Sequence, residues 1–204
     1  MGKHRNDKLR KAIAVDAARM KYEGIEKEYF NAKRKAARRH GVNFKHQPQD
    51  LPTNKEIKDE ILRMAAIFEG DERFVRLEEM RRVGLRVMKI LHNYHPKLIG
   101  SVLKGHIRKN SDIDIHVFSN SIAAITMLLA ENQLEYAVEH KEVIKNNERQ
   151  EFIHVRSVVD GYDVEMSLYS SDKKNFPFKS SITGDTMEFA TIAELEILLL
   201  PELF

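Results

Sequence analysis

Two aspartates separated by one residue, Asp112 and Asp114, have the types and spacing best suited to chemistry. They alternate with Ile113 and Ile115, so on a β-strand both carboxylates would point to the same face. Carboxylate oxygens are ligands that Mg²⁺ prefers, and two such ions about 3.5 to 4 Å apart can stabilise the attacking and leaving oxygens of a phosphoryl transfer. The pair therefore predicts a site for divalent cations, which a third carboxylate would normally complete.

A second alternating segment, residues 162–168, offers two candidates for the third carboxylate, Asp163 and Glu165. Asp160-Gly161 precedes it and is typical of a two-residue hairpin turn. The register that follows from such a turn sets Arg156 opposite Glu165, where its positive charge would favour the ionised carboxylate.

A Gly-Ser pair, Gly100-Ser101, stands ten residues before the Asp112-Ile113-Asp114 pair. This order, with the later strand acid, resembles the DNA polymerase beta-like nucleotidyltransferase superfamily over roughly residues 85 to 170. The resemblance implies an α+β fold with a mixed-sheet nucleotidyltransferase core. It also implies a two-ion Mg²⁺ site and a nucleoside triphosphate as substrate. The reaction would transfer a nucleoside monophosphate to an acceptor hydroxyl and release pyrophosphate; the sequence does not identify the acceptor.

The same resemblance implies that Gly100 and Ser101 contact the nucleotide phosphates, since glycine lets backbone N–H groups approach an anion and serine adds a hydroxyl. We count Lys104 and Ser111 as nucleotide-binding residues too, and expect positive charge from the pair Arg108-Lys109.

The metal-binding and catalytic candidates are Asp112, Asp114, Asp163 and Glu165. The central position in the strand favours Glu165 as the third acid, whereas the family's habit of an aspartate soon after the turn favours Asp163. His116 shares the face of the aspartate pair, but we favour a packed histidine over one that meets the substrate.

The elements expected before Pro96 are helices. The first covers about residues 8–40, with Gly24 as a point where it bends or breaks. The second begins after Thr53, which forms a capping box with Glu56, and its apolar face includes Phe68. The third runs from Asp71 to about Tyr94, and its buried side is expected to consist of Phe74, Leu77, Met80, Val87 and Leu91.

After Pro96 the pattern changes to short strands, which makes this part an α+β domain. The expected strands are 97–102, 113–118, 136–144, 152–159 and 162–169, with a helix at 122–132 and another from Thr191. We therefore divide the chain into a basic helical extension, residues 1–70, and a nucleotidyltransferase-like domain, residues 71–204.

The charge is unevenly spread along the chain. Residues 1–50 hold 14 Lys and Arg against 6 Asp and Glu, a balance of +8, and the remainder holds 20 against 25, a balance of −5. The basic N-terminal helix could attract RNA through its phosphates. A catalytically idle nucleotide- or RNA-binding module on the same fold is therefore the alternative function.

Composition narrows the remaining choices. With no cysteine, disulfides, thiolate zinc sites and a cysteine nucleophile are excluded. No leader pattern or apolar run of membrane-spanning length is present, so we expect a cytoplasmic protein without membrane association. The apolar C-terminal helix after Thr191 could pack on another subunit, which would make the protein a homo-oligomer.

Overall fold

The computed structural model describes residues 2–43, 50–145, 148–180 and 184–200. The chain divides into two compact units. The first consists of Met1–Asp71, Arg108–Asn110 and Ser180–Asp185, and the second of Glu72–Ile107, Ser111–Lys179 and Thr186–Phe204. None of the helices in these described ranges is long and apolar enough to cross a membrane.

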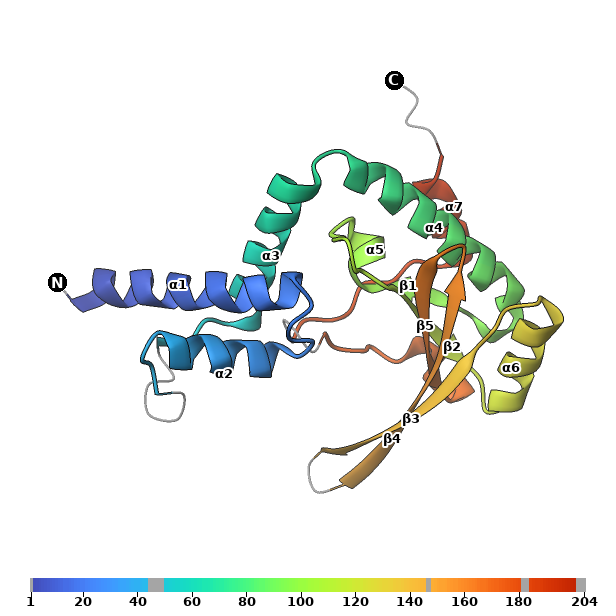
Figure 1. Cartoon of the computed structure of the whole chain (residues 1–204). Helices are drawn as coiled ribbons and strands as arrows, with labels where there is room; N and C mark the ends of the chain where they lie inside the picture. The colour runs from blue at the N-terminus through green and yellow to red at the C-terminus, as the bar shows by residue number, and fades with distance from the viewer. Residues whose placement is uncertain (1, 44–49, 146–147, 181–183, 201–204) are drawn as a thin grey trace. The chain divides into compact units, whose positions relative to one another are not determined.

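Three helices build the first unit: α1 (Gly2–Tyr22), α2 (Tyr29–Arg39) and α3 (Asn54–Glu69) (Figure 1). Helix α1 packs against both α2 and α3, and the core between them is formed chiefly by Ile13, Ala17, Met20, Ala36, Ile57 and Ile61. Gly24, at φ +75°, lies between α1 and α2, so the expected long helix breaks where predicted.

The predicted capping box begins α3: the Thr53 hydroxyl accepts from the Glu56 backbone N–H, and the Glu56 carboxylate accepts from the Thr53 backbone N–H. The prediction of its apolar face is wrong for Phe68, whose surface is 69% exposed. The ring of Phe68 lies 5.9 Å from that of Tyr22 and does not enter the core. Spacing alone could not distinguish this contact at the helix end from burial.

The second unit begins with α4 (Glu72–Ile90), followed by a short 3₁₀ helix, η2 (His92–Tyr94). Four of the five residues expected on its buried side are buried, namely Leu77, Met80, Val87 and Leu91. The expectation is wrong for Phe74, which is 54% exposed. Phe74 lies in the first turn, where the guanidinium of Arg73 covers its ring at 4.7 Å.

A five-stranded mixed sheet forms the centre of the second unit, which confirms the predicted α+β class. The strand order is β1-β2-β5-β4-β3, and only β2 and β5 run parallel within it. The strands are β1 (Lys97–Ile99), β2 (Ile113–Phe118), β3 (Ala137–Lys145), β4 (Glu148–Val159) and β5 (Tyr162–Tyr169). Their apolar side chains share one core with α4 and with α6 (Ile122–Glu131) (Figure 1).

The hairpin between β4 and β5 has the predicted register. Val159 pairs with Tyr162, Arg156 with Glu165, and Ile153 with Leu168. The turn between them consists of Asp160 and Gly161, both at positive φ, as a type I′ turn requires.

The predicted strand 97–102 is wrong beyond Ile99, because Gly100–Lys104 forms a short helix, α5. Gly100 has φ +74°, which ends the extended conformation. Arg81 on α4 then holds the helix, since its Nε donates to the carbonyl of Val102 at 3.2 Å and its Nη2 to that of Leu103 at 3.0 Å. The interruption of the strand therefore depends on a contact distant in sequence.

After β5 the chain passes through η3 (Ser171–Asn175) and returns to β1, where Leu98 and Ala190 form an isolated bridge. The last helix, α7 (Ile192–Leu198), begins with a capping box of Thr191 and Glu194, as predicted for its start. Leu195 is buried, whereas Ile197, Leu198 and Leu200 are exposed. Association of a second subunit through this helix stays a prediction.

Candidate functional site

Strand β2 positions the aspartate pair. Alternation along the strand buries Ile113 and Ile115 against the core, and it directs Asp114 and His116 to the opposite face. Asp112 precedes the strand and is exposed, whereas Asp114 is half-buried. His116 is buried, and its ring centroid lies 4.7 Å from that of Tyr169, in agreement with the packed role that we favoured.

Gly100 lies directly against the carboxylate of Asp114. The antiparallel register pairs Ile99 with Asp114, which brings the next residue, Gly100, over the side chain. A Cβ atom added at Gly100 would stand 2.3 Å from Oδ2 of Asp114, far inside van der Waals contact. Only a glycine permits both this approach and the φ of +74°. The first residue of the Gly-Ser pair and the second residue of the aspartate pair thus form one structural unit.

Glu165 is the register partner of Asp114 on the parallel strand β5. The pKa of Asp114 is raised to about 8, chiefly by burial and in addition by repulsion from the carboxylates of Asp112 and Glu165. The guanidinium of Arg156 opposes this effect. Three acidic groups therefore act electrostatically on one another at the start of β2.

Two basic side chains of β4 hold Glu165. Nη2 of Arg156 donates to Oε2 of Glu165 at 2.5 Å, as the predicted register required. Nδ1 of His154 lies 2.9 Å from Oε1 of the same carboxylate and 3.2 Å from the Ser167 hydroxyl. Glu165 is thus fixed in position and half-buried, whereas Asp163 is exposed and pairs with Val158.

His154 was missed by the sequence analysis, although the register contained the signal. Residues 154 and 156 share a strand face, so the reasoning that placed Arg156 beside Glu165 applies equally to His154. It was overlooked because its register partner is Ser167 and not Glu165. Its contact with Glu165 is therefore diagonal.

Three of the four phosphate-binding candidates, Gly100, Ser101 and Lys104, belong to α5, and the fourth, Ser111, directly precedes the aspartate pair. Ser101 follows Gly100 in the first turn of α5, and its carbonyl accepts from the backbone N–H of His106. Lys104 ends α5 and forms an ion pair with Glu188 at 3.3 Å. Ser111 is half-buried just before the aspartate pair.

The expected basic pair Arg108-Lys109 belongs to the first unit. There the side chain of Arg108 donates to the carbonyl of Lys21, and the backbone N–H of Lys109 donates to Glu69 at 2.9 Å. These contacts give both residues a structural role within that unit.

The donor set around Asp114 suits a hard divalent cation, because its acids are oxygen donors whose mutual repulsion a cation would relieve. As the side chains lie, however, no three His, Asp or Glu residues in the described ranges converge on a common metal position.

The similarity of this chain to known proteins is low. No protein-family model and no curated protein matches the chain. Among solved structures, a cytoplasmic RNA terminal U-transferase is 15% identical over 56% of this chain and 34% of its own, with a TM-score of 0.28. The GLD-2/RNP-8 complex is 18% identical over 50% of this chain and 42% of its own, also with a TM-score of 0.28. The chain thus spans less than half of either structure, and neither likeness determines its activity.

Proposed function

We propose that this chain is a Mg²⁺-dependent nucleotidyltransferase that uses a nucleoside triphosphate. The observation that carries the proposal is the contact between Gly100 and the Asp114 carboxylate, with Glu165 paired beside Asp114 on β5. This arrangement joins the Gly-Ser pair to a group of acids, as a site for a metal-bound triphosphate requires.

In the proposed reaction, an acceptor hydroxyl oxygen forms a bond to the α-phosphorus. The bond between the α-phosphorus and its bridging oxygen breaks, pyrophosphate leaves, and the hydroxyl proton passes to a carboxylate of the site. Bound Mg²⁺ would neutralise the phosphate oxygens and the leaving group.

The residues of the chain have distinct parts in this proposal. Asp112, Asp114 and Glu165 would bind the cations. Arg156 and His154 position Glu165 through the contacts described above. Gly100 and Ser101 would present backbone N–H groups and a hydroxyl to the phosphates.

The test is pyrophosphate release from each of the four ribonucleoside triphosphates with Mg²⁺, in the presence of cell extract as a source of acceptors. Asp112→Asn should abolish release without unfolding the protein, since Asp112 is exposed and the change is isosteric. Asp160→Asn is the matched control, because it alters an exposed aspartate in the hairpin turn that pairs with Arg86. Equal turnover in wild type and Asp112→Asn would contradict the proposal.

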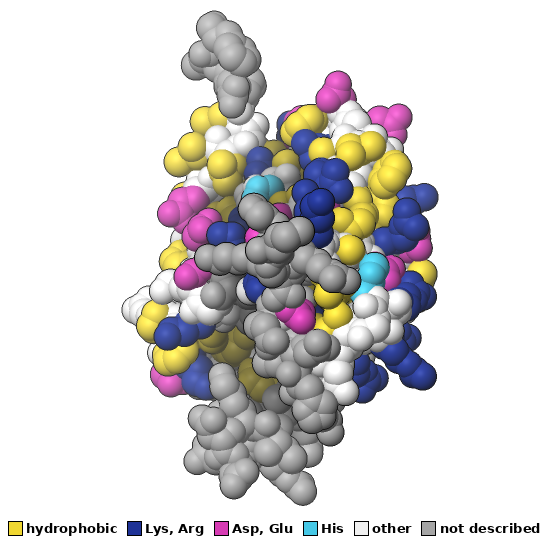
Figure 2. Space-filling view, turned by 90° about the vertical axis from the view of Figure 1, so that its left-hand side faces the viewer, with side chains coloured by type: hydrophobic (Ala, Val, Ile, Leu, Met, Phe, Trp, Pro, Cys, Tyr) yellow, Lys and Arg dark blue, Asp and Glu magenta, His cyan; other side chains and the backbone are white. Residues whose placement is uncertain are grey.

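A second candidate, a catalytically idle RNA-binding module, is favoured by the charge of α2. This helix carries Lys33, Arg34, Lys35, Arg38 and Arg39 and no acidic residue. Arg34 and Arg38 are exposed one turn apart, and the guanidinium of Arg34 lies 5.8 Å from the centre of the exposed Phe30 ring. Aromatic rings and cations together suit single-stranded nucleic acid. Figure 2 shows one face of the molecule, on which Lys and Arg side chains (dark blue) lie among hydrophobic (yellow) and acidic (magenta) ones.

Fluorescence anisotropy with a labelled single-stranded RNA tests this second candidate. The double variant Arg34→Ser/Arg38→Ser should bind RNA more weakly. Its binding should also depend less on salt, because fewer phosphate contacts release fewer counterions from the RNA. Arg82→Ser, at an exposed arginine on α4, should change neither. RNA binding without pyrophosphate release would favour the idle module, whereas equal binding by the double variant and wild type would exclude α2 as the RNA site.

A further inference from the structure

A separate hollow lies on the polar face of the sheet, beyond Asp114. It has a volume of about 260 Å³, and we call it the aromatic pocket. The side chains that matter most in its lining are Lys97, His116, Phe176, Phe178, Met187 and Phe189. Two come from β1 and β2, and the other four from the segment that follows β5.

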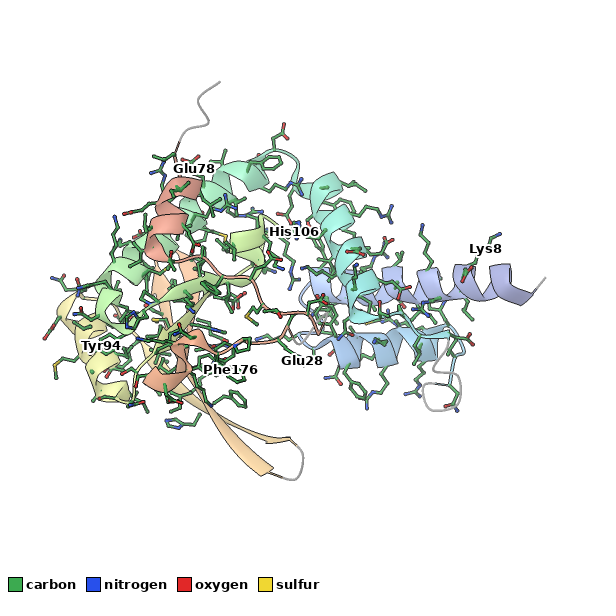
Figure 3. The ribbon with its side chains drawn as sticks, turned by 180° about the vertical axis from the view of Figure 1, so that it is seen from behind. Lys8, Glu28, Glu78, Tyr94, His106 and Phe176 are labelled. Carbon is green, nitrogen blue, oxygen red and sulfur yellow. The ribbon has the colours of Figure 1, made fainter. Side chains whose placement is uncertain are left out.

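The phenylalanines of the aromatic pocket are unusually exposed for their type. Phe176 is 57% and Phe189 47% exposed, although both line a concave surface (Figure 3 labels Phe176). Phe178 lies deeper, with its ring centroid 5.1 Å from that of Phe176 and 4.9 Å from that of His116. Apolar rings gathered around a hollow favour a ligand that would cover them.

Polar groups at one wall restrict what that ligand can be. Nζ of Lys97 lies 3.9 Å from the ring centre of Phe189 and donates to the carbonyl of Lys174 at 2.5 Å. Burial lowers the pKa of Lys97. The contacts with Phe189 and with the Lys174 carbonyl hold the ammonium at the wall, where it can offer only donors to a ligand. A flat ring with acceptor atoms on its edge fits this combination better than an alkyl chain.

The register connects the aromatic pocket to the acids. Lys97 pairs with His116, and Ile99 with Asp114; because Lys97, Ile99 and His116 all line the pocket, it extends from the register position of Asp114 to the residue two further along β2 on the same face. Two residues of a strand span about 7 Å. That step is comparable to one ribose with its 5′ linkage. A ligand with its ring in the pocket would therefore direct its phosphates towards Gly100 and Asp114.

We propose that the aromatic pocket binds the nucleobase of the nucleoside triphosphate, stacked among Phe176, Phe178 and Phe189, with Lys97 facing an acceptor atom of the base. The inference rests on the proposed function and deepens it, since it assigns the base to the segment that follows β5. Removing one stacked aromatic ring is expected to weaken base binding by roughly 10- to 100-fold.

Free nucleosides test the pocket without metal, phosphate or turnover. Adenosine, guanosine, cytidine and uridine would each be titrated into the protein in a buffer that contains a metal chelator, with saturation-transfer NMR as the readout. At least one should bind, and Phe176→Ala and Phe189→Ala should each weaken it about 10-fold or more. Phe176→Tyr should retain binding because it keeps the ring. Phe74→Ala is the matched control: Phe74 is similarly exposed but lies on α4, outside the pocket.

The outcomes separate this inference from the proposed function. Nucleoside binding that depends on Phe176 and Phe189, without pyrophosphate release from any triphosphate, would support nucleobase binding in the pocket and contradict the proposed enzymatic activity. Pyrophosphate release with the same KM in wild type, Phe176→Ala and Phe189→Ala would support the enzymatic activity and contradict nucleobase binding in the pocket. Absence of binding by all four nucleosides would also overturn it.

Discussion

The Cα atom of Gly100 packs so closely on the Asp114 carboxylate that a methyl group cannot stand between them. Alanine is strained at a positive φ, and at Gly100 its methyl group must also displace Asp114. We therefore expect Gly100→Ala to lower the free energy of unfolding by about 2 kcal/mol more than alanine does at a glycine with a similar φ and no close neighbour. Gly41→Ala is the control: its φ is +71° and no atom stands within 4 Å of the added Cβ. Urea unfolding of both variants makes the comparison. Equal losses would show that the contact is relaxed in solution.

The elevated pKa of Asp114 predicts a stability that depends on pH when no metal is present. Because its pKa in the folded protein, about 8, exceeds the ordinary aspartate value of 3.8, the native state holds a proton that the unfolded chain releases. Stability therefore falls as pH rises from about 4 to about 8. Asp114→Asn removes this dependence, and at pH 8 it should stabilise the protein by roughly 1 to 3 kcal/mol.

Thermal unfolding in a chelating buffer at several pH values measures this effect. The two proteins should have similar stability near pH 4 and diverge as the pH rises. Mg²⁺ should then stabilise the wild type and leave Asp114→Asn unchanged, since the cation replaces the proton. A variant less stable than wild type at pH 8 would mean that Asp114 is ionised and already compensated.

The choice between the two later acids can now be made as a prediction. Glu165 is the register partner of Asp114 and contributes to its pKa, so Glu165→Gln should lower pyrophosphate release by about 100-fold or more. Asp163→Asn is its control, because Asp163 is an exposed acid on the same face of the same strand. Circular dichroism of both variants checks the fold. The reverse ranking would identify Asp163 as the metal ligand.

Local patterns were sufficient to predict where β2 and β5 lie and how the β4–β5 hairpin pairs. Alternation located β2 and β5, and the Asp160-Gly161 turn predicted the pairing of Arg156 with Glu165. These features could be predicted because side-chain direction in a strand has a period of two and a two-residue turn leaves one register. The helix starts at Thr53 and Thr191 were also predictable, because a capping box involves only residues three apart in the sequence.

Features that depend on distant contacts were not predictable from the sequence. The helix α5 replaces the end of a predicted strand because Gly100 packs on Asp114 and Arg81 binds the carbonyls of α5. The aromatic pocket requires the segment after β5 to return to β1, through the bridge between Leu98 and Ala190. No periodicity of that segment encodes the return. The predicted burial of Phe68 and Phe74 was wrong for the opposite reason, since helical spacing suggested burial where the core does not extend.

Arg81 supports the candidate site from a distance, and its neighbour in sequence provides a control. Arg81 is half-buried and donates to the carbonyls of Val102 and Leu103, whereas Arg82 is exposed and pairs with Glu78 on its own helix. Arg81→Met should cost about 1 to 3 kcal/mol in free energy of unfolding, because it leaves carbonyls at the end of α5 without a charged donor. Arg82→Met should cost less than about 0.5 kcal/mol.

The same change separates positioning from folding. Because α5 begins at Gly100, a loosened helix should misplace the Gly-Ser pair and raise the KM for the triphosphate in addition to reducing stability. Steady-state kinetics well below the unfolding temperature isolate that effect, since Arg81 lies on α4 and would not touch the reacting atoms. Arg81→Lys keeps one charged donor and should recover part of the KM. An Arg81→Met protein with reduced stability and an unchanged KM would show that α5 keeps its position without Arg81.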